Sequence, residues 1–302
     1  GGNGSSGHYI GGVGFSPDLL WLKERTSTSS HRLFDTVRGA SIRLESNTTA
    51  AEATDTTNMT SFDTDGFTLG NSGSVNASSD DYVAWNWDMG GTTASNTSGS
   101  ITSSVRANTT YGQSIISWTG DGGTGTVGHG LTSAPEFWIT KDRASADNWL
   151  TFFTIVDGSL DAANLNLTNA AGTGSVSLPT SSVFTNDGYT SSQNLITYAF
   201  HSVTGYSKFG SYSGSGSAGK AITTGFAPAF VMTKRTDAVS NWIIWDNTRN
   251  PFNPADKHIL ANSSVAEATT TNPAIDFTST GFELAGNDSS FNASGGTYIY
   301  MA

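Results

Sequence analysis

Three short apolar runs recur along the chain, each ending in a lysine and each at the same distance after a proline. They are residues 19–23, 137–141 and 230–234, after Pro17, Pro135 and Pro228. Short apolar runs bounded by turn residues are typical of strands. Repeats at a fixed period identify an architecture, and the period here, roughly 90 to 120 residues, is that of a small domain. The pattern therefore predicts three similar β units.

Strand signals fill each predicted unit. The clearest alternation lies in residues 82–87, where Tyr82 and Ala84 lie on one face and Val83 and Trp85 on the other. Further strands of the first unit are predicted at 19–24, 31–36, 41–45 and 66–69, and counterparts of the last strand at 195–200 and 298–301. About six or seven short strands per unit suit a small antiparallel sandwich, and a closed barrel is the alternative.

The predicted organisation is all-β, with three tandem repeats that are each a small antiparallel β-sandwich of lectin-like or jelly-roll-like type. The boundaries are 1–89, 112–204 and 205–302. Residues 90–111 contain serine, threonine and asparagine with little apolar surface apart from Ile101 and Val105. Because such a segment buries too little surface to offset the entropy of ordering it, we predict a linker or extended arm there.

Glycine clusters open all three units, beginning at Gly2, Gly120 and Gly214. They match the spacing of a dinucleotide-binding loop, but that chemistry needs a helix directly after the glycines. Here a proline and a strand follow, so we predict hairpin turns with positive φ and no cofactor. Apolar strands lead into the second and third clusters, at 113–118 and 206–212. For the first unit that leading strand lies in sequence outside these residues, comes from a neighbouring chain, or does not exist. Since the chain opens at a point matching the middle of the later repeats, we expect a piece of a longer polypeptide.

Composition narrows the function classes. The 302 residues carry a formal net charge of −11, with a pI near 4.6. A nucleic-acid groove needs a basic face, so we expect no nucleic-acid partner. Cysteine is absent, which removes disulfides and thiolate chemistry. No apolar run approaches the roughly 20 residues that span a bilayer, so we expect no membrane insertion.

The five histidines are scattered and are not spaced as metal ligands, so no metal site is predicted. His31 aligns with Trp149 and Trp242 of the other units, which indicates a position that needs bulk rather than a proton. His129 lies in a glycine-rich turn region, and we expect it to be exposed. Motifs for a nucleophile elbow, a zinc protease or a nucleotide loop are not found, and no enzymatic activity is predicted.

One polar pattern recurs twice after an apolar strand. Asp35 and Arg38 in the first unit match Asp246 and Arg249 in the third, whereas the second unit has residues 153–156 there and lacks the pair. These four residues are the candidate ligand contacts, as a clamp for a sugar hydroxyl or an acidic group. The alternative, which we favour, is a salt bridge that fixes a turn.

Several longer strings resemble the repeats of tail-fibre-like structural proteins of marine bacteriophages, including those of cyanophages. They are residues 15–23, 31–39, 61–70, 205–212 and 295–302. The resemblance covers nearly all of the chain and implies a virion appendage with lectin-like sandwich domains. It supplies no catalytic or binding motif.

From this resemblance we expect a structural virion appendage protein, a tail fibre or spike, that adheres to host cell-surface glycans. One alternative is a structural virion protein without a receptor role, such as a capsid decoration or a filament or shell subunit. Another is a polysaccharide depolymerase. The expected partners are other copies of the chain, other virion proteins and, for an adhesin, host surface polysaccharide. The expected location is the extracellular virion surface.

Overall fold

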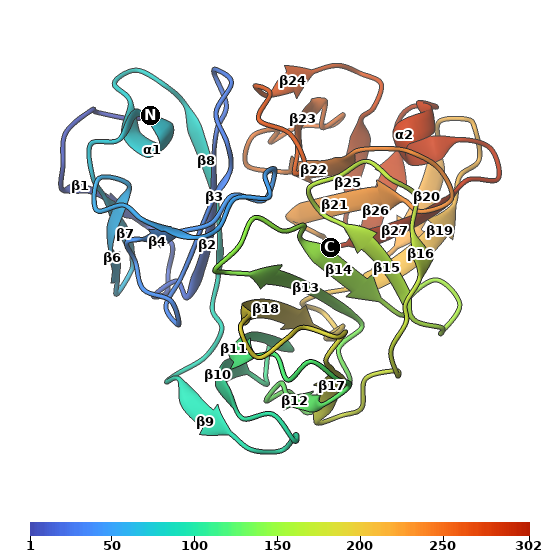
Figure 1. The fold of residues 1–302 in the computed structure, drawn as a ribbon. Coiled ribbons are helices and arrows are strands. Elements are labelled where there is room, and N and C mark those ends of the chain that lie inside the picture. Colours follow the sequence, from blue (N-terminus) through green and yellow to red (C-terminus); the bar gives the residue numbers. More distant parts are fainter.

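The computed structural model describes residues 1–302 and is built almost entirely of strands, which confirms the all-β prediction. The two helices are single turns, α1 (Gly73–Asn76) and α2 (Ser289–Asn292). Figure 1 shows three lobes around a common centre, blue, green and orange-red in chain order. We call residues 1–89, 90–204 and 205–302 the first, second and third units.

The first unit has two antiparallel sheets and a short two-stranded ladder. One sheet has the order β3-β2-β8, the other β1-β7-β6, and β4 pairs with β5. The strands are β1 (His8–Gly11), β2 (Leu19–Glu24), β3 (Arg32–Asp35), β4 (Ile42–Arg43), β5 (Ala53–Thr54), β6 (Met59–Asp63), β7 (Gly66–Leu69) and β8 (Tyr82–Trp87). β2, β7 and β8 have the predicted bounds, whereas β1 and β6 were not predicted as strands.

The third unit has the same plan with a larger first sheet, of order β19-β27-β21-β22-β23-β24, and a smaller one, β20-β26-β25. The strands are β19 (Phe209–Ser213), β20 (Lys220–Thr223), β21 (Phe230–Arg235), β22 (Trp242–Asp246), β23 (Lys257–Leu260), β24 (Ala268–Thr269), β25 (Ile275–Thr278), β26 (Gly281–Leu284) and β27 (Thr297–Met301).

The second unit has an eight-stranded sheet, β16-β15-β14-β13-β18-β11-β10-β9, and the pair β12-β17. The strands are β9 (Ala94–Asn96), β10 (Ser103–Asn108), β11 (Gln113–Thr119), β12 (Thr126–Gly128), β13 (Phe137–Asp142), β14 (Leu150–Phe153), β15 (Asp161–Asn164), β16 (Gly172–Thr173), β17 (Val183–Thr185) and β18 (Asn194–Phe200).

The linker predicted at 90–111 is wrong, because this segment forms β9 and β10 at the edge of the second unit's sheet. β10 pairs with β11 from Ser104 to Asn108. Its two apolar residues, Ile101 and Val105, are both buried in the core of that unit. Backbone pairing along an existing sheet edge orders a polar segment that could not bury enough surface alone.

Each unit has a core of its own between its two sheets. In the first unit alternate residues of β2, Leu20 and Leu22, pack there against Phe67 and Leu69 of β7. The corresponding cores of the second and third units are built around Trp138 and Trp245.

The remaining residues of the large sheets meet in a fourth core, which all three units share. This cluster contains 24 buried residues. Trp21 of β2, Ile139 of β13 and Met232 of β21 all belong to it. The apolar runs are continuous rather than alternating because both faces of these strands are buried. The units are therefore individually cored and also joined by one common core.

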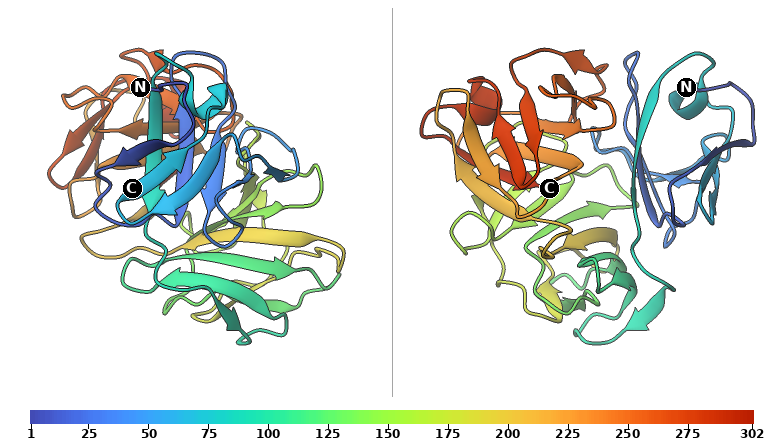
Figure 2. Two further views of the ribbon diagram at one scale, coloured as in Figure 1. Left: turned by 90° about the vertical axis from the view of Figure 1, so that its left-hand side faces the viewer. Right: turned by 180° about the vertical axis from the view of Figure 1, so that it is seen from behind.

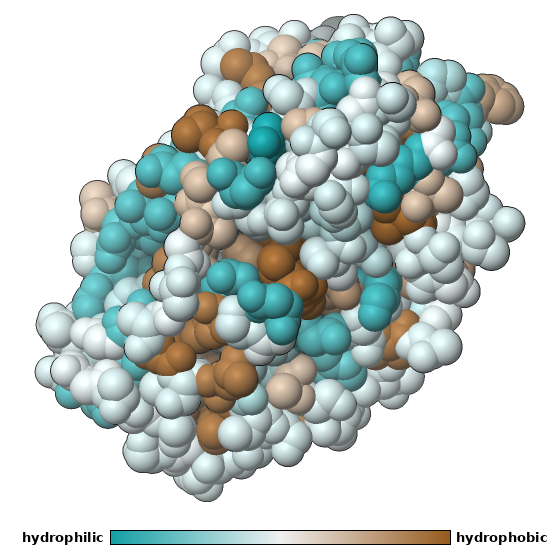
Figure 3. Space-filling model, turned by 90° about the vertical axis from the view of Figure 1, so that its right-hand side faces the viewer, coloured by the Kyte–Doolittle hydropathy of each residue, from teal (hydrophilic) through white to brown (hydrophobic).

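Matching backbone hydrogen bonds link the units in cyclic order. The Glu52 N–H donates to the Arg143 carbonyl (2.9 Å), joining the first and second units. The Ala171 N–H donates to Thr236 (2.8 Å), and the Glu267 N–H donates to Arg25 (2.9 Å). The last bond joins the third unit back to the first, so the contacts close a ring of three (Figure 2). On the face that carries the second and third units, apolar residues show both in the recessed parts and at separate raised positions (Figure 3).

Because the central core is shared, we expect the three units to unfold together. Ile244→Ala, at a fully buried position of that core, should lower the free energy of unfolding by about 2–5 kcal/mol. Differential scanning calorimetry should still show one transition with equal calorimetric and van't Hoff enthalpies. The control Val239→Ala, at a site 73% exposed, should change stability by less than about 0.5 kcal/mol. Separate transitions would contradict the shared-core account.

Candidate functional site

The candidate pair Asp35–Arg38 lies where β3 ends and the chain turns. The Arg38 Nε donates to Asp35 Oδ2 at 2.6 Å, and the Arg38 backbone N–H donates to the other carboxylate oxygen at 2.8 Å. Arg38 also donates to the carbonyl of Leu33 (3.1 Å). Asp35 is 0% exposed and Arg38 is 6% exposed. The carboxylate therefore fixes the turn and the guanidinium together.

Asp246 and Arg249 repeat this geometry after β22. The Arg249 Nε lies 2.6 Å from Asp246 Oδ2, and the Arg249 N–H donates to the same carboxylate at 2.8 Å. These side chains are also buried. The structure thus brings each aspartate to its own arginine and does not bring the two pairs together. Both pairs are buried and hydrogen-bonded within the chain, so the geometry agrees with the turn-fixing interpretation of all four residues.

Each pair also receives an aromatic donor from another unit. The Tyr198 hydroxyl of β18 donates to Asp35 Oδ2 at 2.7 Å. The Trp85 Nε1 of β8 donates to Asp246 Oδ2 at 3.1 Å, and the Arg249 guanidinium lies 5.7 Å from the centre of the Trp85 ring. Burial raises the pKa of Tyr198 well above its ordinary value, so its hydroxyl stays protonated and donates. The pairs are therefore parts of the interfaces between units.

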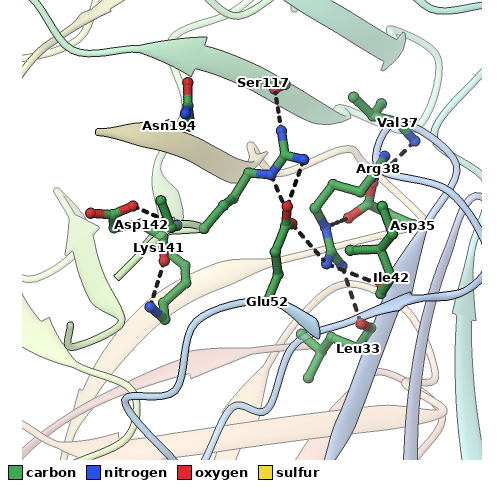
Figure 4. Close-up of polar contacts among 12 residues, drawn as sticks. Leu33, Asp35, Val37, Arg38, Ile42, Glu52, Ser117, Lys141, Asp142 and Asn194 are labelled. Atoms are coloured by element: carbon green, nitrogen blue, oxygen red, sulfur yellow. Dashed lines mark hydrogen bonds and ion pairs between the residues drawn. The ribbon is translucent and has the colours of Figure 1, made fainter. Parts of the chain in front are cut away.

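A glutamate extends each pair across the interface. Glu52 lies 3.8 Å from Arg38 and accepts from Arg143 of the second unit at 2.8 and 2.9 Å (Figure 4). Glu267 accepts from Arg249 at 2.8 Å and, through both oxygens, from Arg25 of the first unit. Bidentate contacts of this kind fix orientation as well as charge.

The interface between the third and second units replaces this network with apolar residues. Phe153 and Val156 stand where the other units have aspartate and arginine, and Ala171 stands in place of the glutamate. Met301, which occupies the register position of Tyr198 and Trp85, packs in the shared core with Phe153. Partners have therefore changed together: where the carboxylate is missing, its donors are missing too.

At all three interfaces, the ring N–H of an aromatic side chain lies at hydrogen-bonding distance from a backbone carbonyl of the neighbouring unit. Trp149 Nε1 donates to the Glu45 carbonyl at 2.9 Å, and Trp242 Nε1 donates to Asn164 at 3.0 Å. The third member is His31, whose Nε2 lies 3.0 Å from the Leu260 carbonyl.

The His31 ring is neutral and carries its proton on Nε2. The indole of Trp21 can only donate, and it donates to His31 Nδ1 at 2.8 Å, so Nδ1 accepts and Nε2 donates to Leu260. Burial lowers the pKa of His31 to about 3, which keeps the ring neutral. The sequence comparison recognised the need for bulk at this position but missed the need for a ring N–H.

The lysines that end the apolar runs, Lys23, Lys141 and Lys234, are fully buried. Lys234 Nζ donates to the carbonyls of Ser240 (2.7 Å) and of Thr168 in the second unit (3.1 Å). Burial lowers the pKa of Lys23 and of Lys234 to about 8. An amine with such a pKa is a nucleophile in some enzymes, but these amines are buried and donate to backbone carbonyls.

The prediction that His129 is exposed is wrong. Its ring is 0% exposed, with Nδ1 accepting from the Leu131 N–H at 3.1 Å and Nε2 lying 3.1 Å from the Thr180 carbonyl. Histidines and carboxylates nowhere gather in groups of three or more that could hold a metal ion. Neither helix is long and apolar enough to cross a membrane.

Three hollows that open at the surface adjoin the first unit. A polar depression of about 510 Å³ is lined by Phe15, Asp88 and Arg106, among others. A groove of about 990 Å³ runs along β8 between the first and third units, and a pocket of about 140 Å³ adjoins the other face of β8. Both the groove and the pocket are lined by Tyr82 and Ala84.

The model of one protein family, a domain of unknown function designated DUF7483, matches residues 1–302. The chain belongs to the DUF7483 family. Neither a curated protein nor a solved structure matches it. Since the family description carries no activity, the function of this DUF7483 chain has to be argued from its own residues.

Sequence reasoning found the aspartate–arginine pairs but missed the residues that complete them in this DUF7483 chain. A signal was present in the internal repeats. Tyr198, Trp85 and Met301 occupy one repeat position, and the apolar member accompanies the unit that has Phe153 in place of aspartate. Side chains that change together from one repeat to the next indicate a contact between them. The spacing alone does not show that this contact lies between two different units.

Removing a guanidinium from this network should be costly. Arg38→Met leaves the buried Asp35 carboxylate without its cation, so we expect a loss of about 3–5 kcal/mol in the free energy of unfolding, measured by urea denaturation. Arg235→Met breaks a more exposed pair with Asp237 and should cost less than about 1 kcal/mol. The triple variant Asp35→Phe, Arg38→Val, Tyr198→Met copies the apolar interface and should recover most of the loss. Equal losses for Arg38→Met and Arg235→Met would contradict the network.

Proposed function

We propose that this chain is a non-catalytic structural module of a virion appendage. The observation that carries the proposal is the closed ring: the recurring polar motif, the ring N–H donors and the buried lysines all contact other parts of the chain. Catalytic groups need an open position beside a substrate, whereas these groups are buried and already hydrogen-bonded within the chain. A body whose three units share one core suits a part that keeps its shape. The resemblance to tail-fibre-like repeats supports a place on the virion.

This proposal is tested on particles of the phage that encodes the chain. Gold-labelled antibodies raised against residues 1–302 should decorate purified virions at a fixed site, a tail fibre or spike, in negative-stain electron microscopy. The particles should also contain the chain by mass spectrometry. Antibodies that bind no particle, together with absence of the chain from them, would rule out a virion role.

A second candidate function, adhesion to host cell-surface glycans, is favoured by the polar depression. Its lining combines the half-buried Phe15 ring with Asp88, Arg106 and Asn108. A sugar needs such a combination, an apolar ring to stack on and polar groups for its hydroxyls. Several weak contacts of this kind would be multiplied where many copies stand on one particle.

Glycan binding is tested with wild-type protein on a glycan array and on host cells. The variant Phe15→Ala should bind its best glycan about five- to tenfold more weakly, because ring packing contributes about 1 kcal/mol. Phe252→Ala, at a ring 83% exposed outside the depression, is the matched control and should bind as the wild type does. If neither the chain nor its oligomers bind any glycan, the adhesion function is ruled out and only the structural role remains.

A further inference from the structure

The outer edge of β8 differs from the matching edges in the other units. β18 pairs with both β13 and β11, and β27 pairs with both β21 and β19, whereas β8 pairs with β2 alone. All but one residue of β18 and of β27 is buried, but in β8 only Trp85 is buried. The second and third units therefore each have a strand, β11 or β19, on the outer side of the final strand, and the first unit has no such strand beside β8.

The backbone of β8 is arranged to accept such a strand. The odd-numbered residues of β8 turn their backbone N–H and C=O groups toward β2. At the two ends of the strand, the Asp18 N–H donates to the Trp87 carbonyl (2.9 Å) and the Arg25 N–H donates to the Asp81 carbonyl (2.8 Å). In an antiparallel ladder the alternate residues turn their N–H and C=O groups to the other side. Those residues are Tyr82, Ala84 and Asn86. A row of such groups at a sheet edge is a template for a further strand.

The register of that strand is set by the turn at Gly2. The Gly2 N–H donates to the Asp80 carbonyl at 2.8 Å, and the Ser79 N–H donates back to Gly2 at 3.2 Å. In the third unit Gly214 makes the same exchange with Gly296 and Gly295, at 2.8 and 3.0 Å. There the ladder continues into β19 beside β27, with Tyr212 opposite Tyr298 and Phe209 opposite Met301. Beside β8 the same register places residues opposite Tyr82 and Trp85.

The side chains of β19 and β11 show what belongs opposite Tyr82. Tyr212 of β19 enters its unit's own core and stacks on Tyr298 with ring centres 5.0 Å apart. Trp118 of β11 also enters its unit's own core, where it meets Phe184 edge to face with ring centres 5.8 Å apart. In the first unit this place is the 140 Å³ pocket, which is lined by Tyr82, Phe67 and Leu22. The pocket therefore has the size and the lining for one aromatic side chain.

The same strands show what belongs opposite Trp85. Phe209 and Ile115 enter the shared core, where Phe209 lies 5.8 Å from Phe137. In the first unit this place is the groove along β8, which is lined by Trp85, Trp87 and Phe230. Asp246 and Arg249 also line it but are already paired. A neutral, bulky apolar side chain fits there.

We propose that the groove and the pocket form an acceptor site for one extended polypeptide strand. The strand runs antiparallel to β8, with a bulky apolar residue opposite Trp85 and, three residues later, an aromatic residue opposite Tyr82. Its occupant is a strand of the β19 type from outside residues 1–302, because β11 and β19 are both already paired. Main-chain hydrogen bonds to an edge provide affinity in such sites, and the alternate side-chain pockets provide specificity. This site goes beyond the proposed function, since it concerns strand binding and not a glycan.

The proposal is tested with a labelled synthetic peptide of the sequence 207–212, Ser-Lys-Phe-Gly-Ser-Tyr, which ends before the register positions that Gly1 and Gly2 already occupy. Fluorescence anisotropy should show saturable binding, and a control peptide with serine in place of both aromatic residues should bind at least tenfold more weakly. Hydrogen exchange should slow at the amides of Tyr82, Ala84 and Asn86 when the peptide is bound. The amides of Val83 and Trp85, which already face β2, should change little.

Ala84→Pro removes one outward N–H without touching the ladder to β2, because proline is tolerated at an open strand edge. It should abolish peptide binding, whereas the matched variant Ala84→Ser should bind as the wild type does. The exchange experiment on the wild type does not depend on this variant's folding. Absence of binding, equal binding of the control peptide, or protection away from β8 would overturn the proposal. So would sedimentation velocity showing that two copies pair through β8 in place of the peptide.

Discussion

Burial of both faces of the large sheets is the constraint on which the structure depends. A sheet that covers one core on one face and a second core on the other cannot alternate apolar with polar residues, so β2, β13 and β21 each begin with an unbroken apolar run, at 19–22, 137–139 and 230–232. Units as small as these bury a limited fraction of their surface when alone. The shared core supplies the missing burial, and it ties the fold of each unit to the presence of the other two.

The polar network follows from the same constraint. Three similar units that meet face to face could associate in more than one arrangement if all their interfaces were apolar. Buried ion pairs contribute little net stability, because desolvation offsets their attraction, but a wrong neighbour would leave a charge unpaired. Asp35 and Asp246 each need a neighbouring unit that supplies a hydrogen-bond donor, which is Tyr198 for Asp35 and Trp85 for Asp246. The Phe153 side chain has no polar group, so it needs an apolar side chain from the neighbouring unit. The ring is thus assembled from interfaces that differ in chemistry, and its order is specified by that difference.

The strands with strong apolar patterns were predictable from the sequence, and β2, β7 and β8 were placed to the residue. The hairpin glycines were predictable for a physical reason as well: Gly4, Gly122 and Gly216 all have φ near +70 to +80°. The segment of β9 and β10 was not, because its order comes from pairing with β11 rather than from its own surface. The buried position of the Asp35–Arg38 pair was not either. An aspartate followed three residues later by an arginine has the same sequence pattern on a solvated turn as on a buried one. Here the packing of β18 against the turn excludes water.

The open edge of β8 can be understood from these same interfaces. Closing the ring requires every unit to present a large sheet to the centre, and in two units a strand beside the final one contributes a side chain there, Ile115 or Phe209. Without a third contribution, the part of the contact between the first and third units that lies beside β8 is made by Trp85, Trp87 and Phe230 around a groove. This is the interface at which Trp85 must also reach Asp246. A strand bound along β8 would shield that hydrogen bond from water, and a hydrogen bond to a buried carboxylate strengthens as its surroundings become less polar. Occupation of the edge would therefore act on the contact between the first and third units through the Trp85 indole.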